Sequence, residues 1–232
     1  MVDYGLAFKR PFMDMKTLSI GAGLYLLVTV LLLVPFIGWL AAMALGLVLN
    51  GYMLLCAKTI MDKKKDLPEF KNYGGLFVQG LIFTVITLIY LIPALVIGIV
   101  VGGVAFMTGV TTGGSLLSIF GGLGLSLMLF VLVILLTFYV LPVAIMNYAK
   151  TGKFNSAFQF AHVFRKAFTG TYFVPWFIAG VYIFALMAVA GMIELLLAIT
   201  IVLPFVIGAV ASFMLGVTVY SLLAQAVNET KG

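Results

Sequence analysis

The chain has 232 residues, of which 64% are hydrophobic and only 9% are charged, with a formal net charge of +6 at pH 7. Soluble globular domains are about half apolar and about one quarter charged, so this composition excludes a soluble domain. The single cysteine, Cys56, excludes an intrachain disulfide and is expected to pack as a small apolar residue inside a helix.

Long runs without charge predict membrane-spanning helices. Four runs contain no Asp, Glu, Lys or Arg, namely 17–57, 72–149, 167–193 and 195–228. A spanning helix needs about 20 apolar residues at a rise of about 1.5 Å each. Turn-forming residues divide the runs at Pro35 to Trp39, at the Gly-, Thr- and Ser-rich stretch 101–122, and at Thr200 to Pro204. The sequence therefore predicts an all-α membrane protein with about six spans, near 17–34, 37–58, 76–100, 123–148, 172–197 and 203–227.

The cations are confined to the segments between the predicted hairpins. All 13 Lys and Arg residues fall in 1–16, 58–71 and 150–166, or at Lys231. Because basic residues are retained on the cytoplasmic side, this segregation predicts three hairpins in a multi-pass protein with both termini cytoplasmic.

Each polar segment is rich in aromatic residues and precedes a predicted hairpin, which indicates a loose repeat. The pattern predicts one membrane domain over 1–232 with loose repeats at 1–60, 61–149 and 150–232. Each repeat is expected to begin with a cytoplasmic amphipathic helix lying in the membrane interface. The first would place Phe8 on its apolar side, and the second would begin at Asp66 and place Phe70 there.

The third segment, 154–168, shows the helical pattern most clearly. Its apolar face would carry Phe154, Ala157, Phe158, Ala161, Phe164 and Phe168, and its polar face Asn155, Gln159, His162 and Lys166. The residues predicted to contact lipid headgroups are Phe154, Phe158, Phe164, His162, Lys166, Phe70 and Phe8. Because the aromatic residues form the face that enters the membrane, they are not free to stack on bases, and no nucleic-acid partner is expected.

No arrangement of residues that performs catalysis is visible. The sequence shows no Ser-His-Asp set, phosphate-binding loop, paired catalytic carboxylates or zinc spacing, so no catalytic residue, cofactor or metal site is predicted. Glu194 is the one ionisable residue inside a predicted span, roughly 33 Å from the start of that span. It has two interpretations, a hydrated glutamate near the outer interface or a proton or cation site.

Two rows of small residues predict close helix packing. The first row is Gly98 and Gly102, and the second is Gly208, Ser212 and Gly216. Small residues let helix backbones approach where lipid provides no hydrophobic drive for association. The rows pack helices either within one subunit or between subunits, which leaves a homo-oligomer or a partner membrane protein open.

Three stretches carry a resemblance to a known family: "DYGLAFKRPF" (3–12), "KDLPEFKNYGGLFVQGL" (65–81) and "MNYAKTGKFNSAFQFAHVF" (146–164). With them, nearly the whole chain resembles an archaeal family of polytopic membrane proteins, the domain of unknown function 4013. The chain is also distantly similar to the membrane domain attached to some glycerophosphodiester phosphodiesterases, without their soluble catalytic domain. The resemblance implies a plasma-membrane location and no specific activity.

The leading hypothesis is a non-enzymatic integral membrane protein that engages lipid as a membrane-organising or accessory subunit. The alternative is a channel or carrier for a small neutral or lipid-like solute, with the Gly-rich outer segment as its entrance. A membrane enzyme acting on lipids would need clustered titratable groups. The available residues, Asp62, Asp66, Glu69 and His162, are scattered along the sequence.

Overall fold

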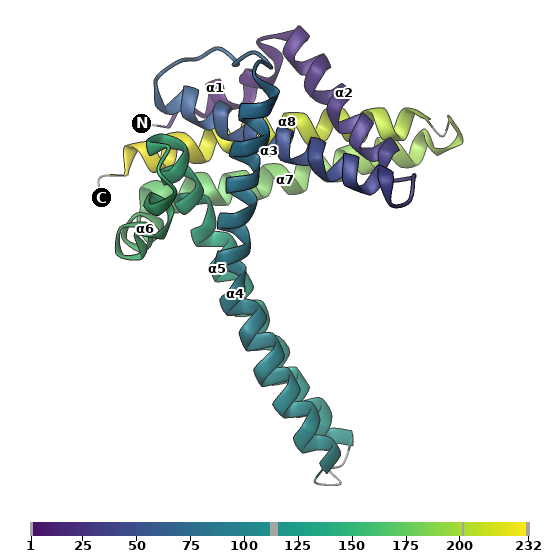
Figure 1. Cartoon of the computed structure of the whole chain (residues 1–232), viewed down its shortest axis with the longest axis vertical. Helices are drawn as coiled ribbons and strands as arrows, with labels where there is room; N and C mark the ends of the chain where they lie inside the picture. Colours follow the sequence, from purple (N-terminus) through teal and green to yellow (C-terminus); the bar gives the residue numbers. More distant parts are fainter. Residues whose placement is uncertain (1, 112–115, 201, 231–232) are drawn as a thin grey trace. The chain divides into compact units, whose positions relative to one another are not determined.

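The computed structural model describes residues 2–111, 116–200 and 202–230, and this part of the chain is all-helical (Figure 1). The α-helices are α1 (Tyr4–Lys9), α2 (Met15–Leu31), α3 (Ile37–Met61), α4 (Tyr73–Thr111), α5 (Leu116–Thr151), α6 (Phe160–Ala167), α7 (Gly170–Leu196) and α8 (Val202–Glu229). Short 3₁₀ helices follow α1 (η1, Arg10–Phe12), precede α6 (η2, Phe154–Phe158) and follow α7 (η3, Ala198–Thr200). The predicted all-α class is confirmed.

Five of the described helices are long and apolar enough to cross a membrane: Ile37–Met61, Tyr73–Val104, Leu127–Thr151, Gly170–Leu196 and Val202–Glu229. Helix α2 has 17 residues, short of the roughly 20 that a bilayer requires. Its axis turns by 76° from the segment Tyr4–Phe12, and the two together would make a sixth span. The sequence predicts six spans. The described helices provide five, or six if that bent pair crosses the membrane as one span.

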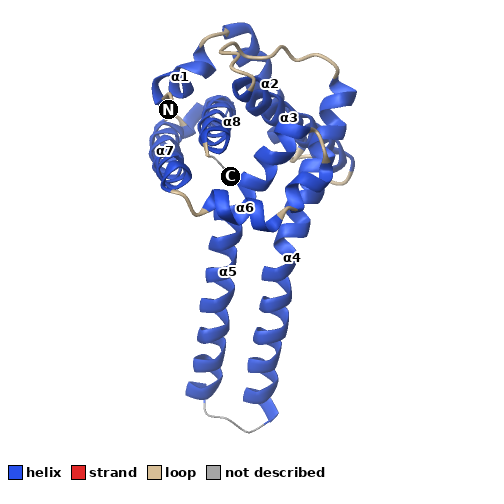
Figure 2. Cartoon of the chain, turned by 90° about the vertical axis from the view of Figure 1, so that its left-hand side faces the viewer, coloured by secondary structure: helices blue, strands red, loops and turns tan. Residues whose placement is uncertain are grey.

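The helices form two compact units. Unit 1 comprises Met1–Thr84 and Val143–Gly232, and unit 2 comprises Val85–Pro142. Unit 2 is an antiparallel pair made of the second part of α4 and the first part of α5, which run side by side in Figure 2. Within this pair Gly98 lies against Phe130, because a Cβ added at Gly98 would sit 3.0 Å from the phenyl ring.

Helix α8 lies in the middle of unit 1, where it contacts α1, α2, α3 and α7 (Figure 2). The core forms around Tyr52 of α3, whose ring stacks on Phe70 at a centroid distance of 3.7 Å and whose hydroxyl donates to the Pro68 carbonyl at 2.9 Å. Phe213 of α8 completes this aromatic group and covers Gly21 of α2, where a Cβ would sit 2.1 Å from its ring. Burying these aromatic side chains joins α2, α3, α8 and the segment before α4.

Local sequence sets the helix ends. The Asp3 and Asp14 carboxylates cap α1 and α2 by accepting the amides of Leu6 at 2.8 Å and Lys16 at 3.0 Å. Between α2 and α3, Phe36 adopts a φ of 59°, and a few residues on the Trp39 indole donates to the Leu32 carbonyl at 3.1 Å. The Pro/Gly turn predicted at 35–39 therefore lies at the junction of α2 and α3.

Two sequence predictions about the polar segments are wrong. The helix predicted from Asp66 begins only at Tyr73, because residues 66–72 follow a non-helical path that carries Phe70 into the core. The single amphipathic helix over 154–168 is two short helices interrupted at Gln159, which has ψ 69°. The stretch 101–122 is helical up to Thr111 and again from Leu116, and residues 112–115 lie outside the described part, as do 201 and Lys231.

Candidate functional site

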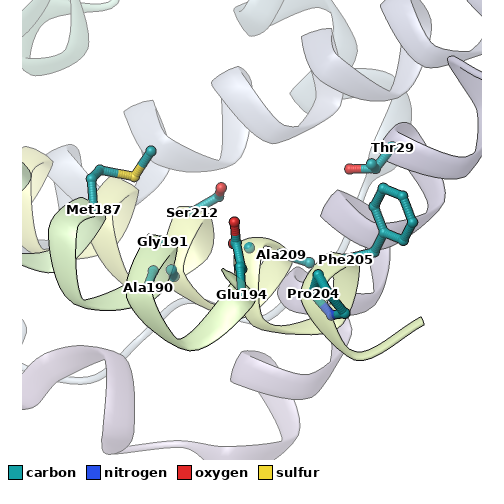
Figure 3. Close-up of a pocket in the computed structure, with 11 residues that line it drawn as sticks. Thr29, Met187, Ala190, Gly191, Glu194, Pro204, Phe205, Ala209 and Ser212 are labelled. Carbon is teal, nitrogen blue, oxygen red and sulfur yellow. The ribbon is translucent and has the colours of Figure 1, made fainter. Parts of the chain in front are cut away.

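A pocket of about 400 Å³ lies in unit 1 where the end of α7 meets the start of α8 and the second half of α2 (Figure 3). Its polar lining comes from three elements, with Glu194 on α7, Ser212 on α8 and Thr29 on α2. Figure 3 shows the Glu194 carboxylate pointing into the pocket and the Thr29 hydroxyl pointing toward it from the opposite side. The pocket therefore joins one carboxylate with two hydroxyl groups.

Small residues create this space. Gly191 and Gly208 line the pocket, and a Cβ added at Gly208 would sit 2.9 Å from the Glu194 Oε1 atom. Any larger residue at 208 would therefore displace the carboxylate. Pro204 lies in the first turn of α8, where its missing N–H costs no helical hydrogen bond.

The electrostatics of the pocket are dominated by Glu194, its only ionisable lining residue. In the described part of the chain, the Glu194 carboxylate has no hydrogen-bond or ion-pair partner. The Thr29 hydroxyl donates to the Tyr25 carbonyl at 3.0 Å, which leaves its oxygen free to accept from a ligand. The arrangement can bind a cation or a group that donates several hydrogen bonds. Over the same residues, no group of three His, Cys, Asp or Glu side chains could hold a metal ion.

The structure places the predicted row on α8 inside unit 1. Gly208 and Ser212 line the pocket beside α7, and a Cβ at Gly216 would sit 2.7 Å from the Met53 methyl group of α3. These three residues therefore make contacts or line space within one chain. In the other row Gly98 contacts Phe130, whereas nothing lies within 4 Å of a Cβ added at Gly102.

The residues predicted at the membrane interface have different surroundings. Phe154, Phe164 and Phe168 are 43%, 39% and 63% exposed. Phe158 and His162 are half-buried, and so is Phe8, which packs edge-on against Tyr182 at a ring distance of 5.0 Å. Phe70 is a core residue and Lys166 is buried, so neither side chain lies on the outer surface of the described structure.

Lys166 belongs to a group of cations and amides at the ends of α5, α6 and α8. We call Lys150, Arg165 and Lys166, with Asn147 and Asn228, the basic cluster. Lys166 Nζ donates to Asn147 Oδ1 at 3.3 Å, and Lys150 Nζ donates to Asn228 Oδ1 at 2.8 Å. Burial lowers the pKa of the Lys166 ammonium, and repulsion by Lys150 and Arg165 lowers it further. Burial also lowers the pKa of His162, with help from Lys166 and Arg165.

Two features at this end of unit 1 were missed by sequence reasoning. Arg10 is fully buried, although its sequence context reads as ordinary interfacial charge. A cleft of about 630 Å³ is lined by the run Lys63 to Lys65 together with Thr59 and Asp66. Three consecutive lysines were a signal for the cleft, whereas nothing near Arg10 in the sequence indicates its burial.

Comparison with known proteins gives one match. The model of the family described as "Protein of unknown function (DUF4013)" matches residues 31–199, which is more than half of the chain. No curated protein and no solved structure matches significantly. Together with its apolar helices, the match shows a multi-pass membrane protein of a family without an assigned activity. The chain belongs to the DUF4013 family.

Proposed function

We propose that this protein is a non-enzymatic membrane-organising or accessory subunit that holds anionic lipid at the end of unit 1 where the basic cluster lies. In this proposal the helices form hairpins, and both termini and the basic cluster lie on the cytoplasmic side. The observation that carries the proposal is a row of exposed aromatic residues at α6 beside exposed cations on α6 and in the chain just before it.

The aromatic row consists of Phe160 and Phe164 of α6 and of Phe168 directly after it, spaced four residues apart in the chain. Three other residues of α6, Val163, Lys166 and Ala167, are buried against the protein. Leaving a phenylalanine side chain in water rather than in an apolar environment costs about 1.5–3 kcal/mol. Three exposed phenyl rings therefore support contact with the acyl and headgroup boundary of a membrane.

Cations flank this row where lipid phosphates would lie. Arg165 is exposed on α6 itself, and Lys150 and Lys153 are exposed just before it in the chain. Each Lys or Arg near an anionic membrane surface contributes about 1 kcal/mol of attraction. The cleft lined by Lys63 to Lys65 adds a second cationic surface in unit 1. Aromatic insertion and charge attraction together support selective retention of anionic lipid.

The test is lipid retention by a variant with Phe160, Phe164 and Phe168 all changed to Ser. We expect native mass spectrometry to show less phosphatidylglycerol bound to this variant than to the unchanged protein. The matched control is Phe36→Ser, which alters an exposed phenylalanine in the α2–α3 turn. The proposal fails if the α6 variant and the control retain the same amount of phosphatidylglycerol.

A second function, a channel or carrier for a small solute, is favoured by the Glu194 pocket. An ammonium or polyhydroxyl solute would supply hydrogen-bond donors to the carboxylate and to the Thr29 and Ser212 oxygens. We expect ethanolamine to raise the thermal unfolding midpoint of the protein and to lose this effect in Glu194→Gln. Glu69→Gln, at an exposed carboxylate outside the pocket, is the control. An equal shift in Glu194→Gln and the control would exclude binding in this pocket.

A further inference from the structure

Lys166 is a buried cation whose hydrogen bonds are incomplete. The residue is 7% exposed, and its ammonium group carries three N–H donors. One donor reaches Asn147 Oδ1 at 3.3 Å. Among the described residues no other acceptor and no carboxylate contacts Lys166. A buried charge that is neither paired nor fully hydrogen-bonded is costly, so a missing acceptor is expected here.

Asn147 supplies a second unfilled donor next to the first. Its side chain is 6% exposed, and its Nδ2 atom is buried without a hydrogen-bond partner in the structure. The Oδ1 atom of the same amide already faces the Lys166 ammonium, so the two side chains are in direct contact. Buried amide N–H groups are nearly always hydrogen-bonded in proteins. The Lys166 ammonium and the Asn147 amide therefore each lack a hydrogen-bond acceptor.

The surrounding charge indicates that the missing acceptor is an anion. Lys150 and Arg165 are close enough to lower the pKa of the Lys166 ammonium, and no acidic group in the described residues acts against them. Lys150 is exposed, and its Nζ atom is held by Asn228, whose own Nδ2 donates to the Met61 carbonyl at 3.4 Å. The Lys166 ammonium is therefore subject to repulsion by its basic neighbours without a compensating acidic group, and Lys150 beside it is exposed.

We propose that Lys166, Lys150 and Asn147 form a binding site for a phosphate group. A phosphate offers several acceptor oxygens arranged around one centre, so it can accept from the ammonium groups and the amide at once. The phosphate could belong to an anionic lipid headgroup or to a free phosphate ion. The lipid source rests on the proposed function, because it places this end of unit 1 at an anionic membrane surface.

The experiment measures binding to the full-length protein in detergent micelles by isothermal titration calorimetry. The two ligands are inorganic phosphate and dioctanoyl phosphatidic acid. We expect Lys166→Met to weaken binding by about ten-fold or more, the effect of losing a charge-assisted hydrogen bond. Lys71→Met, at an exposed cation outside the basic cluster and the Lys63–Lys65 cleft, should bind like the unchanged protein. Because Lys150 is exposed, Lys150→Met should fold normally, and it should also weaken binding.

The outcomes separate the site from the proposed function. Loss of both ligands in Lys166→Met, or of the lipid alone, supports a site for the headgroup phosphate. If phosphatidic acid never binds but inorganic phosphate binds through Lys166, the site holds and the lipid function fails. If the lipid binds equally well to the unchanged protein, Lys166→Met and Lys150→Met, the site is overturned while the lipid function stands. Absence of binding by either ligand to the unchanged protein overturns the site as well.

Discussion

Arg10 organises the end of unit 1 near the basic cluster through its five N–H donors, and each donor is used. Its Nε donates to the Lys65 carbonyl at 3.2 Å. The two Nη atoms donate to the Cys56 carbonyl at 2.8 Å, the Ser221 hydroxyl at 2.9 Å, the Thr59 hydroxyl at 2.7 Å and the Asp66 carbonyl at 3.1 Å. One side chain thus joins the N-terminal segment to α3, to the chain after α3 and to α8.

Replacing Arg10 should destabilise the protein strongly. In Arg10→Leu, the Lys65 and Asp66 carbonyls lose the donor that Arg10 provides, and each such loss costs about 1–3 kcal/mol. We therefore expect a loss of about 2 kcal/mol or more in the free energy of unfolding, seen as a lower thermal unfolding midpoint in detergent. The adjacent Lys9 is exposed, so Lys9→Leu should leave the midpoint nearly unchanged. Similar midpoints for the two variants would contradict a structural role for Arg10.

At the scale of helices, α3 crosses the start of α4 with direct backbone contact. A Cβ added at Gly51 would sit 1.9 Å from the Leu76 carbonyl oxygen, and one added at Gly80 would sit 1.8 Å from the Leu47 carbonyl oxygen. The two contacts are reciprocal, because each helix contributes a glycine and, four residues away, a carbonyl. This is close packing by small residues, which in membranes replaces the hydrophobic drive available in water.

The crossing gives a prediction for two single substitutions. Gly51→Ala and Gly80→Ala should each lower the thermal unfolding midpoint, because overpacking costs about 1–3 kcal/mol and the clash here is with backbone. Gly46 lies on the same helix α3 and has nothing within 4 Å of an added Cβ. Gly46→Ala should therefore leave the midpoint unchanged or raise it slightly, since alanine favours helix. The crossing is not as tight as described if Gly51→Ala and Gly46→Ala unfold at the same temperature.

The sequence was informative about helices and poor about the contacts between them. The spans could be predicted because an uncharged run of 20 or more residues has few structures available in a membrane. The path of residues 66–72 could not, since Phe70 leaves the interface to stack on Tyr52, a contact between residues far apart in the chain. Gly51 and Gly80 were missed for a similar reason, because they lie on different helices and form no row in the sequence.

The candidate site was predicted in the same uneven way. Glu194 was identifiable because it is the one ionisable residue in an apolar run. Its pocket was not, because Thr29 comes from α2 and reaches the pocket only through the packing of α2 against α8. The sequence pattern places Lys166 on the polar face of one regular helix. In the structure the helix is interrupted at Gln159, and Lys166 is buried together with Val163. The helical spacing of residue types in the sequence does not reveal such a break.

At the scale of the whole molecule, the ends of unit 1 differ in charge. The first helix and the last part of α8 meet at one end, where the Asp3 amide donates to Gln225 Oε1 at 2.7 Å (Figure 1). The α7–α8 connection at the other end exposes Leu195, Leu196 and Ile199 and carries no cation. Because basic residues stay on the cytoplasmic side, the end where α1 meets α8 is expected to face the cytoplasm.

Cysteine labelling tests this orientation, because the one native cysteine is not expected to react. Cys56 is fully buried, so the unchanged protein should not react with a membrane-impermeant maleimide. In intact cells Ile199→Cys should react, because Ile199 is 95% exposed in the α7–α8 connection. Lys64→Cys and Lys153→Cys should react only after the membrane is permeabilised, since both lysines are exposed among the segregated cations. Labelling of either of these two in intact cells would reverse the orientation and would remove the cytoplasmic lipid surface from the basic cluster.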